Sequence, residues 1–249
     1  MPIRPVLEPP ATRRQRFGRR RLLRALSTVL MVAGIALLVD AGLTLVWQEP
    51  VTALLGRLHQ NALGGDLDKL KAAGPTAGER RALAKMDDAR RRVAFLARSL
   101  RRRAAEGDAV GRIRIPRADA NFVLVKGTQG PDLRKGPGIY EQTPFPGVPG
   151  TTAIAGHRTT YLAPFRHLDR LRPGDPITVE MPYATFTYKV QRTRIVPPDA
   201  LWILRRAGYD RLVLSACHPL FSAAKRIVVF ARQTRMAPTR IAQRRGSEA

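Results

Sequence analysis

Residues 211–232 read Arg-Leu-Val-Leu-Ser-Ala-Cys-His-Pro-Leu-Phe-Ser-Ala-Ala-Lys-Arg-Ile-Val-Val-Phe-Ala-Arg, and the fold can be built outward from this stretch. Two short apolar runs, Leu212–Ala216 and Ile227–Phe230, flank a segment that contains a proline and a serine. Runs rich in β-branched residues and bounded by turn residues predict strands. Two strands joined by so short a link pair antiparallel, and neighbouring strands lie about 4.8 Å apart.

Cys217 ends the first of these strands and is the only cysteine in the chain. Arg226 opens the second strand, so the antiparallel pairing is expected to bring its guanidinium close to the thiol. A single cysteine excludes an intramolecular disulfide, and in an exported domain it is either an intermolecular link or a reactive thiol. The alternative is a buried cysteine that acts as a small hydrophobic residue.

Similar patterns recur throughout residues 110–235. Alternating or β-branched runs occupy Arg112–Ile115, Phe122–Val125, Thr152–Ala155, Pro176–Glu180 and Thr185–Val196. Loops rich in Pro and Gly separate them, and one or two helical turns are expected within residues 199–208. With the two strands around the cysteine, these runs predict a single all-β sandwich or barrel. Residues 236–249 are expected to be a basic tail.

Residues 25–47 are almost entirely apolar and follow an arginine-rich segment, residues 1–24, which is expected to be a disordered tail. As a helix, residues 25–47 would measure about 34 Å, against about 30 Å for a hydrocarbon core. Asp40 would cost roughly 3 kcal/mol at mid-membrane, but about a dozen Leu, Ile, Val and Met residues each contribute roughly 0.3 to 0.6 kcal/mol. The balance predicts a transmembrane anchor. A cleaved signal peptide is the alternative, although residues 43–47 offer no small-x-small site.

The position of the arginines predicts the topology. Positive charge before the span keeps the N-terminus cytoplasmic and sends everything after Trp47 outside a cell membrane crossed once. The net charge of +25 suggests nucleic acid, anionic lipid or an anionic polymer as a neighbour. An outward-facing domain makes nucleic acid an unsuitable partner, which leaves lipid headgroups and wall polymers.

Residues 48–109 are expected to form a helical stalk. Gly64-Gly65 and Gly74-Pro75 are expected to break it into pieces. Between Leu83 and Leu100, apolar residues recur at steps of three and four, which predicts an amphipathic helix with an arginine-rich outer surface. Two interpretations remain open: the helix docks on the domain, or it lies on anionic headgroups.

A thiol becomes a strong nucleophile as the thiolate, which a nearby imidazole or cation promotes. Of the four histidines, His59 lies in the predicted stalk and His167 in a polar loop. His218 follows the cysteine directly, so its side chain points to the opposite face of the strand. His157 lies where a predicted strand meets a loop, the usual place for catalytic groups. The sequence therefore favours His157, with a plain surface histidine as the alternative.

Arg226 stays protonated and cannot act as a base. It can donate hydrogen bonds to the oxyanion that forms when a thiolate attacks a carbonyl, and such donors contribute a few kcal/mol. The alternative is an arginine solvated on a strand edge.

Three segments together resemble a sortase, the membrane-anchored cysteine transpeptidase of Gram-positive bacteria. They are Ile154–Arg158, Leu214–Cys217 and Lys225–Val229, in the family's order of His, Cys and Arg. Gly136–Tyr140 and Gly156–Tyr161 look most like class E, with classes D and F less close. The family usually has Thr-Leu-x-Thr-Cys, whereas this chain has Val-Leu-Ser-Ala-Cys. Any contact made by the two threonine hydroxyls is therefore lost or supplied by Ser215.

The resemblance implies a closed eight-stranded barrel and two-step acyl transfer without a metal or cofactor. Cys217 would attack the Thr–Gly bond of a Leu-Pro-x-Thr-Gly or Leu-Ala-x-Thr-Gly sorting signal on a surface protein. His157 would transfer the protons, and Arg226 would bind the substrate backbone and the oxyanion. An amine on a peptidoglycan precursor, or a pilin lysine, would resolve the thioester. Tyr140 and Tyr161, with Ser215, are the candidate substrate-binding residues.

Three rival interpretations can be weighed on the residues. An L,D-transpeptidase would need Ser-x-Gly-Cys-x-Arg, but Ala216 precedes the cysteine. A papain-like hydrolase would carry its cysteine on a helix, whereas residues 212–216 are strand-like. A catalytically silent, membrane-tethered module that binds anionic wall polymer explains the basic charge equally well.

Overall fold

The computed structural model describes residues 13–46 and 50–243. The chain forms two compact units, Met1–Trp47 and Gln48–Ala249. The first contains α1 (Arg13–Val46). Within α1, Arg21–Gly42 has a mean hydropathy of 2.3 and is long and apolar enough to cross a membrane.

Helix α1 corrects the predicted N-terminal tail of residues 1–24. Residues 1–12 lie outside the described residues, but residues 13–24 are helical. Arginine is a good helix former, and extending an existing helix is far easier than nucleating a new one. The basic segment therefore continues the apolar helix toward the N-terminus. Trp47, the predicted interfacial residue, lies outside the described residues.

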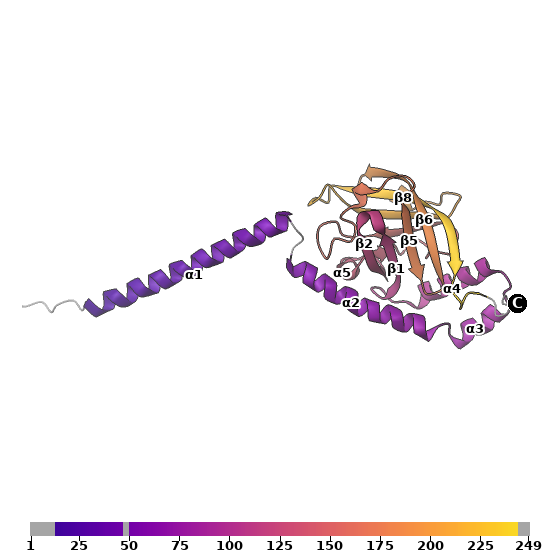
Figure 1. The fold of residues 1–249 in the computed structure, drawn as a ribbon, viewed down its shortest axis with the longest axis horizontal. Coiled ribbons are helices and arrows are strands. Elements are labelled where there is room, and N and C mark those ends of the chain that lie inside the picture. The colour runs from indigo at the N-terminus through magenta and orange to yellow at the C-terminus, as the bar shows by residue number, and fades with distance from the viewer. Residues whose placement is uncertain (1–12, 47–49, 244–249) are drawn as a thin grey trace, which may run out of the picture. The chain divides into compact units, whose positions relative to one another are not determined.

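The second unit is built on a closed barrel with the strand order β1-β2-β3-β4-β7-β8-β6-β5, as the resemblance implied (Figure 1). Its strands are β1 (Ala109–Ile115), β2 (Ala120–Lys126), β3 (Gly138–Ile139), β4 (Thr151–Ala155), β5 (Pro176–Met181), β6 (Ala184–Val196), β7 (Arg211–His218) and β8 (Lys225–Pro238). Most neighbours are antiparallel, but β2–β3 and β4–β7 are parallel pairs. The β4–β7 pair joins segments about sixty residues apart in the sequence.

The helices of this unit surround the lower side of the barrel in the view of Figure 1. They are α2 (Pro50–Ala73), α3 (Ala77–Ala84), α4 (Ala89–Arg103) and α5 (Gly130–Lys135). Three short 3₁₀ turns, η1 (Pro116–Ala118), η2 (Leu168–Arg170) and η3 (Leu201–Leu204), lie in the connections between strands. The amphipathic pattern predicted between Leu83 and Leu100 is divided between α3 and α4. Asp88 caps α4, accepting a hydrogen bond from the Arg91 backbone N–H.

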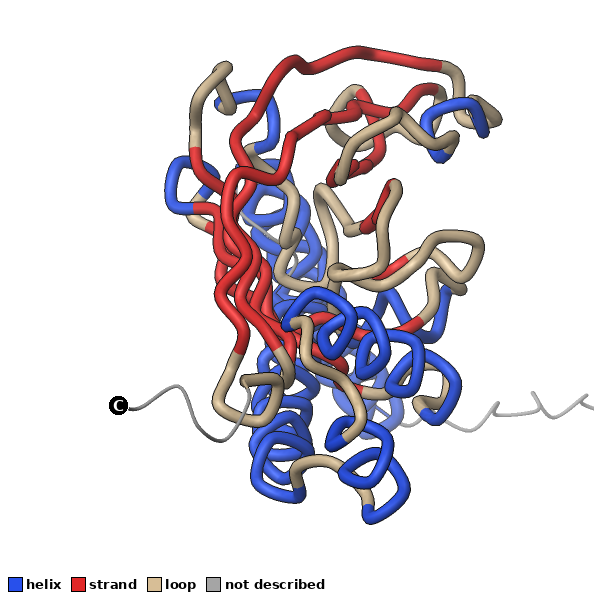
Figure 2. Tube along the Cα trace, turned by 90° about the vertical axis from the view of Figure 1, so that its right-hand side faces the viewer, coloured by secondary structure: helices blue, strands red, loops and turns tan. Residues whose placement is uncertain are grey.

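The segment predicted as a stalk is helical and packs on the barrel. Val93, Leu96 and Leu100 of α4 are buried in the main core. Gln60 of α2 clamps β2, because its side chain donates to the Val123 carbonyl and accepts from the Val123 N–H. Figure 2 shows these helices grouped beneath the strands. The docked interpretation of α4 therefore holds within this unit.

Of the two breaks expected in this segment, one is absent and the other is present. Helix α2 runs through Gly64-Gly65 without interruption, because its face toward the barrel, including Leu63 and Leu67, is buried on both sides of the pair. The predicted break at Gly74 is real: Gly74 has φ +62°, and it directly follows the last residue of α2. Left-handed backbone of this kind favours glycine at the end of a helix.

The predicted basic tail also begins too early. Strand β8 continues to Pro238 because β6 is long enough to pair with it, through Ala184 opposite Pro238. Beyond it, Ala242 is fully buried, and the Arg92 side chain donates to the Ala242 carbonyl at 3.0 Å. Residues 236–243 are thus part of the fold, and residues 244–249 lie outside the described residues.

Two apolar clusters lie on the two faces of the sheet around β7. Alternate residues of a strand point to opposite faces. Leu212, Leu214 and Ala216 belong to the main core. Val213 belongs to a second cluster, which also contains residues of β4, β6, η3 and β8: Ala153, Val196, Ile203, Val228 and Phe230. The second cluster forms the floor on which the candidate site lies.

Candidate active site

Cys217 and Arg226 lie opposite one another on β7 and β8. They are paired residues of the antiparallel register, as the sequence predicted. Both side chains are half-buried, so the thiol is not sealed from solvent. Arg226 Nη1 donates to the carbonyls of Ala223 at 2.8 Å and Lys225 at 3.0 Å, which holds the guanidinium over the β7–β8 turn.

His157 arrives at the same place through the parallel pairing of β4 with β7. Ala155 is opposite Ser215, and the Gly156 N–H donates to the Ser215 carbonyl at 3.1 Å. His157 and Cys217 each come two residues after this pair. Because the carboxyl ends of parallel strands meet at one edge of a sheet, His157 and Cys217 follow the paired strands at the same edge.

The alternation of β7 decides which side chains face the site. Cys217 and Ser215 share the face of Val213, the second cluster, whereas His218 belongs to the opposite face. There, Arg158 Nη1 donates to His218 Nδ1 at 2.9 Å. The geometry agrees with the sequence argument that His218 points away from the thiol.

The electrostatics of His157 favour a neutral imidazole. Burial lowers its pKa, and the positive charge of Arg134 lowers it further. Among the described residues, the buried His157 Nε2 has no hydrogen-bond partner. Its ring centroid lies 5.2 Å from that of Tyr161. An imidazole held by packing, with one nitrogen unbonded, can accept a proton or a hydrogen bond from an incoming group.

Arg134 provides a test of these electrostatics. Arg134→Gln removes a cation that disfavours the imidazolium, so the pKa of His157 is expected to rise toward its ordinary value. An NMR titration of the His157 ring measures this directly. Arg134 is exposed, so the difference between variant and wild type should shrink at high salt. An unchanged pKa at low salt would contradict the assignment of Arg134 as a cause.

The candidate substrate-binding residues occupy two positions. The hydroxyls of Tyr140 and Ser215 are 2.9 Å apart and hydrogen-bonded, and Ser215 is almost fully buried. Tyr140 also packs against the second cluster. Ser215 therefore holds Tyr140 against the second cluster, and the Tyr161 ring packs beside the His157 imidazole at a tilt of 37°.

The loop after His157 has an unusual backbone. Tyr161, Leu162 and Ala163 have φ values of 50°, 65° and 42°. Left-handed backbone at non-glycine residues costs on the order of 1–3 kcal/mol each and persists only where the surroundings enforce it. Here the Phe165 N–H donates to the His157 carbonyl at 3.0 Å. A Cβ added at Gly56 of α2 would lie 2.8 Å from Leu162 Cγ, so α2 presses directly on this loop.

We predict that Gly56→Gln lowers stability by about 1–3 kcal/mol through overpacking, and lowers catalytic efficiency because the displaced loop carries Tyr161. Denaturant unfolding and a peptide-cleavage assay measure the two effects. Gly65→Gln is the matched control, because it lies on the same helix with open space around it. That control is expected to stabilise slightly, by up to about 1 kcal/mol. Equal behaviour of the two variants would contradict a positioning role for Gly56.

Arg158 is a site residue that the sequence analysis did not assign a role. Its buried guanidinium joins three segments, donating to the Arg166 carbonyl, to His218 Nδ1 and to Asp169 Oδ1 at 3.2, 2.9 and 2.8 Å. Partial burial raises the pKa of Asp169, but the hydrogen bond from Arg158, a backbone hydrogen bond and the nearby positive charges together outweigh it, and the pKa is lowered. Arg158 therefore fixes the end of β7 against the His157 loop. In the sequence, only its position directly after His157 could have indicated that Arg158 belongs to the site.

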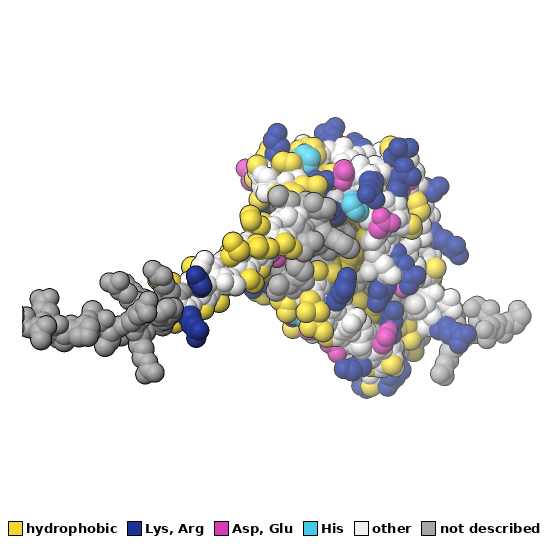
Figure 3. Space-filling model, turned by 60° about the vertical axis from the view of Figure 1, so that its left-hand side comes forward, with side chains coloured by type: hydrophobic (Ala, Val, Ile, Leu, Met, Phe, Trp, Pro, Cys, Tyr) yellow, Lys and Arg dark blue, Asp and Glu magenta, His cyan; other side chains and the backbone are white. Residues whose placement is uncertain are grey.

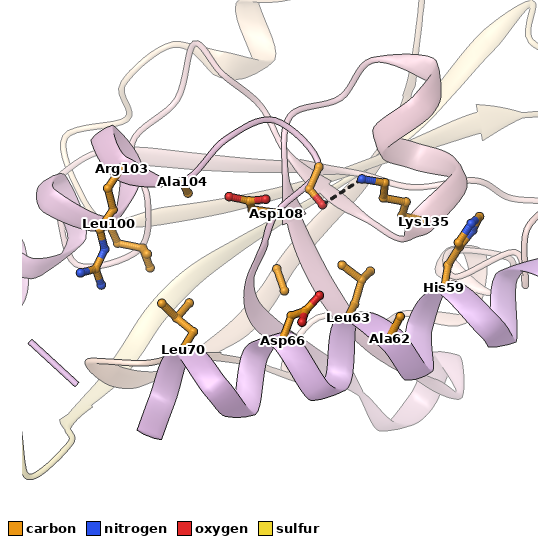
Figure 4. Close-up of a pocket in the computed structure, with 12 residues that line it drawn as sticks. His59, Ala62, Leu63, Asp66, Leu70, Leu100, Arg103, Ala104, Asp108 and Lys135 are labelled. Atoms are coloured by element: carbon orange, nitrogen blue, oxygen red, sulfur yellow. Dashed lines mark hydrogen bonds between the residues drawn. The ribbon is translucent and has the colours of Figure 1, made fainter. Parts of the chain in front are cut away.

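A separate cavity of about 490 Å³ lies between α2, α4 and β1 (Figure 4). Leu63, Asp66 and Leu70 of α2 line one side, with Leu100 and Arg103 of α4 opposite. The close-up shows Lys135 reaching across to the chain near Asp108, where its Nζ donates to the Gly107 carbonyl. The residues of the candidate site do not line it. Across the described residues, no group of three or more His, Cys, Asp or Glu side chains could hold a metal ion.

Comparison with known proteins identifies this architecture. Residues 113–234 match the family model described as the sortase domain. The barrel belongs to the sortase family. The sortase fold also matches the crystal structure of Sortase E1 from Streptomyces coelicolor with a tripeptide in its active site, with a TM-score of 0.50 and 27% identity. That match covers 53% of this chain and 91% of the other.

Two curated relatives extend the likeness. Sortase D from Bacillus subtilis (strain 168) is 32% identical over 131 residues, which cover 51% of this chain and 65% of that protein. Sortase SrtE1 from Streptomyces coelicolor is 31% identical over 98 residues, covering 36% of this chain and 28% of that protein. The chain thus spans less than two thirds of either relative. The barrel is thus class E-like, and one of its two curated relatives is a Sortase D.

Proposed function

We propose that this chain is a membrane-anchored cysteine transpeptidase that joins proteins bearing a sorting signal to an amine. One observation carries the proposal: the pairing of β4, β7 and β8 brings the backbones of His157, Cys217 and Arg226 to one end of the sheet, with Cys217 partly exposed. These are the nucleophile, the proton carrier and the oxyanion donor that acyl transfer requires. Membership of the barrel in a family of cysteine transpeptidases supports it.

In the first step, the Cys217 thiolate attacks the threonine carbonyl of a Leu-Pro-x-Thr-Gly or Leu-Ala-x-Thr-Gly segment. A bond forms between Sγ and the carbonyl carbon, and the carbonyl oxygen takes the negative charge. When the oxyanion collapses, the C–N bond to glycine breaks. The imidazolium of His157 gives its proton to the departing amine, which leaves a thioester and a neutral imidazole.

In the second step, the acceptor amine attacks the thioester carbonyl. His157 takes the proton that the amine loses, and the C–S bond breaks as the new amide forms. The cysteine departs as a thiolate, and the site regains its starting charge. The low pKa of His157 suits this step, because a neutral imidazole is the form that can accept a proton. A peptidoglycan-precursor amine is the proposed acceptor, and a pilin lysine is the alternative.

Arg226 is the proposed donor to the oxyanion. In the free structure its Nη1 is bonded to carbonyls of the β7–β8 turn, which leaves Nε and Nη2 as further donors of the guanidinium. Its pairing with Cys217 in the β7–β8 register supports this role. Tyr140 and Tyr161 are proposed to contact the substrate around the thiol.

The apolar helix supports a membrane role for the chain. We propose that residues 25–47 span the cell membrane once, with the arginine-rich N-terminus in the cytoplasm and the barrel of residues 110–235 outside. This places the thiol on the side where exported substrates and cell-wall amines are found. Exported surface proteins, a cell-wall amine and the membrane are thus the proposed partners, and nucleic acid is not.

Transpeptidation by the full chain in detergent or vesicles tests the proposal. A quenched sorting-signal peptide is supplied with an amine, and mass spectrometry follows cleaved peptide, thioester and amide product. The expected result is an amide product together with an acyl adduct on Cys217. A catalytically silent module that binds anionic wall polymer predicts neither species. Varying Pro and Ala at the second peptide position then identifies the preferred signal.

Arg226→Lys is expected to lower kcat by about 10²-fold, in the range found when one oxyanion donor is removed. Lysine keeps the charge but cannot reproduce the fixed fork of the guanidinium. Peptide cleavage and amine transfer should fall together, because both steps pass through an oxyanion. Arg232→Lys, on the same strand, is the control and should stay near wild type. Full activity of Arg226→Lys would remove this arginine from the mechanism.

A further inference from the structure

We propose that the first two turns of α2 form a membrane-contact surface, which lies in the interface of the bilayer that holds the anchor. Leu54, Leu55 and Leu58 form this surface, and they are 60%, 44% and 57% exposed. The proposal rests on the proposed membrane anchor. It adds a second point of attachment, made by the folded unit itself.

The geometry of α2 puts these leucines on the face away from the barrel. Gly56 is buried and contacts the loop that carries Leu162. Residues two apart on a helix point about 200° apart, so Leu54 and Leu58 lie opposite Gly56. One face of these turns therefore belongs to the fold, and the opposite face is apolar and exposed. An amphipathic helix of a soluble protein has polar residues there.

The second half of α2 provides an internal comparison. Its inner face is buried in the same way, through Leu63 and Leu67. Its outer face carries exposed polar or small residues, such as Gly65 and Lys69. The apolar outer surface is thus confined to the first two turns, which follow the predicted span most closely along the chain.

The chain itself indicates which partner covers the leucines. Only residues 43–53 separate Leu54 from the end of the apolar span at Gly42. If α1 crosses a bilayer, α2 must begin beside that bilayer. Exposed Arg57 lies at the border of the leucine surface and suits anionic headgroups, since interfacial helices combine an apolar face with basic residues. Figure 3 shows apolar side chains on the surface of the second unit as well as on the long helix.

The matched test uses the full chain in vesicles of phosphatidylethanolamine and phosphatidylglycerol. In a Cys217→Ser background, an environment-sensitive fluorophore is attached to Leu58→Cys or to Lys69→Cys, which lies on the same outer face three turns later. A spin-labelled lipid quenches from the bilayer, and iodide quenches from water. We expect at least ~3-fold stronger lipid quenching at position 58, because interfacial helices bury their apolar face about 5–10 Å deep.

The other outcomes separate the explanations. If iodide reaches both positions equally, the leucines face water and the proposal is overturned. If position 58 is shielded from iodide but not quenched by lipid, another protein surface covers it, a second copy of this chain included, and the proposal is also overturned. If the chain fails to float with the vesicles, both the anchor and the contact surface are refuted. Peptide cleavage measured on the wild-type chain in the same vesicles shows whether the catalytic proposal survives independently.

Discussion

Cys217→Ala is expected to abolish peptide cleavage and amine transfer together, with a loss of roughly 10⁴-fold or more, as found when a catalytic nucleophile is removed. The reason is chemical: Cys217 is the only cysteine, and without its sulfur no thioester forms. Because the side chain is half-buried at the end of β7, its truncation should leave the barrel folded. Mass spectrometry should show no acyl adduct, and circular dichroism should match the wild type.

Ser222→Ala is the control for this variant. Ser222 lies in the same β7–β8 turn, where its hydroxyl accepts a hydrogen bond from the Ala224 N–H. Its loss should change activity by no more than about 2-fold, as is usual for a substitution outside the reacting groups. If Cys217→Ala kept wild-type cleavage, the thioester mechanism would be wrong.

The sequence predicted the part of the site that is local. The β7–β8 pair follows from two apolar runs and a short turn, and its register places Cys217 opposite Arg226. The residue types also distinguished His157 from His218, because strand alternation sends adjacent side chains to opposite faces. Short-range periodicity is enough for conclusions of this kind.

Other parts depend on contacts that leave no local pattern. Strand β3 is only Gly138–Ile139, too short for any periodicity, and its glycine-rich surroundings indicated a loop. The parallel pairing of β4 with β7 joins segments about sixty residues apart, so only the resemblance to sortases could anticipate it. In the sequence Arg158 resembles any other surface cation, but the fold surrounds it with acceptors from the β4–β5 connection and from β7.

The same limit explains why α2 was predicted to break. Gly64-Gly65 lowers the intrinsic helix propensity by about 1 kcal/mol per glycine. Burial of Leu63 and Leu67 against the barrel outweighs that cost, since a buried leucine contributes about 1.5–3 kcal/mol. The helix that results also positions Gly56 against the His157 loop. A segment expected to be a spacer is thus part of the support of the candidate site.

His157→Gln is expected to lower kcat by about 10³-fold, within the range for loss of a general acid–base group. Glutamine retains a polar side chain of similar length but cannot carry a proton between the two steps. The thiol remains, so slow alkylation of Cys217 should still be detectable, which separates this variant from Cys217→Ala. His167→Gln, in the same long loop, is the matched control and should stay within about 2-fold of wild type.

The pH profile gives this prediction a second readout. In the wild type, activity needs a thiolate, which rising pH favours, and an imidazolium, which rising pH removes, so the profile is bell-shaped with apparent pKa values that belong to the pair. The pKa of His157 is lowered, so the imidazolium is lost at a lower pH than for an ordinary histidine. The falling limb of the pH profile therefore lies at a lower pH. His157→Gln should remove that falling limb and leave activity that only rises with pH. If the falling limb persisted in His157→Gln but disappeared in His167→Gln, the proton carrier would be His167.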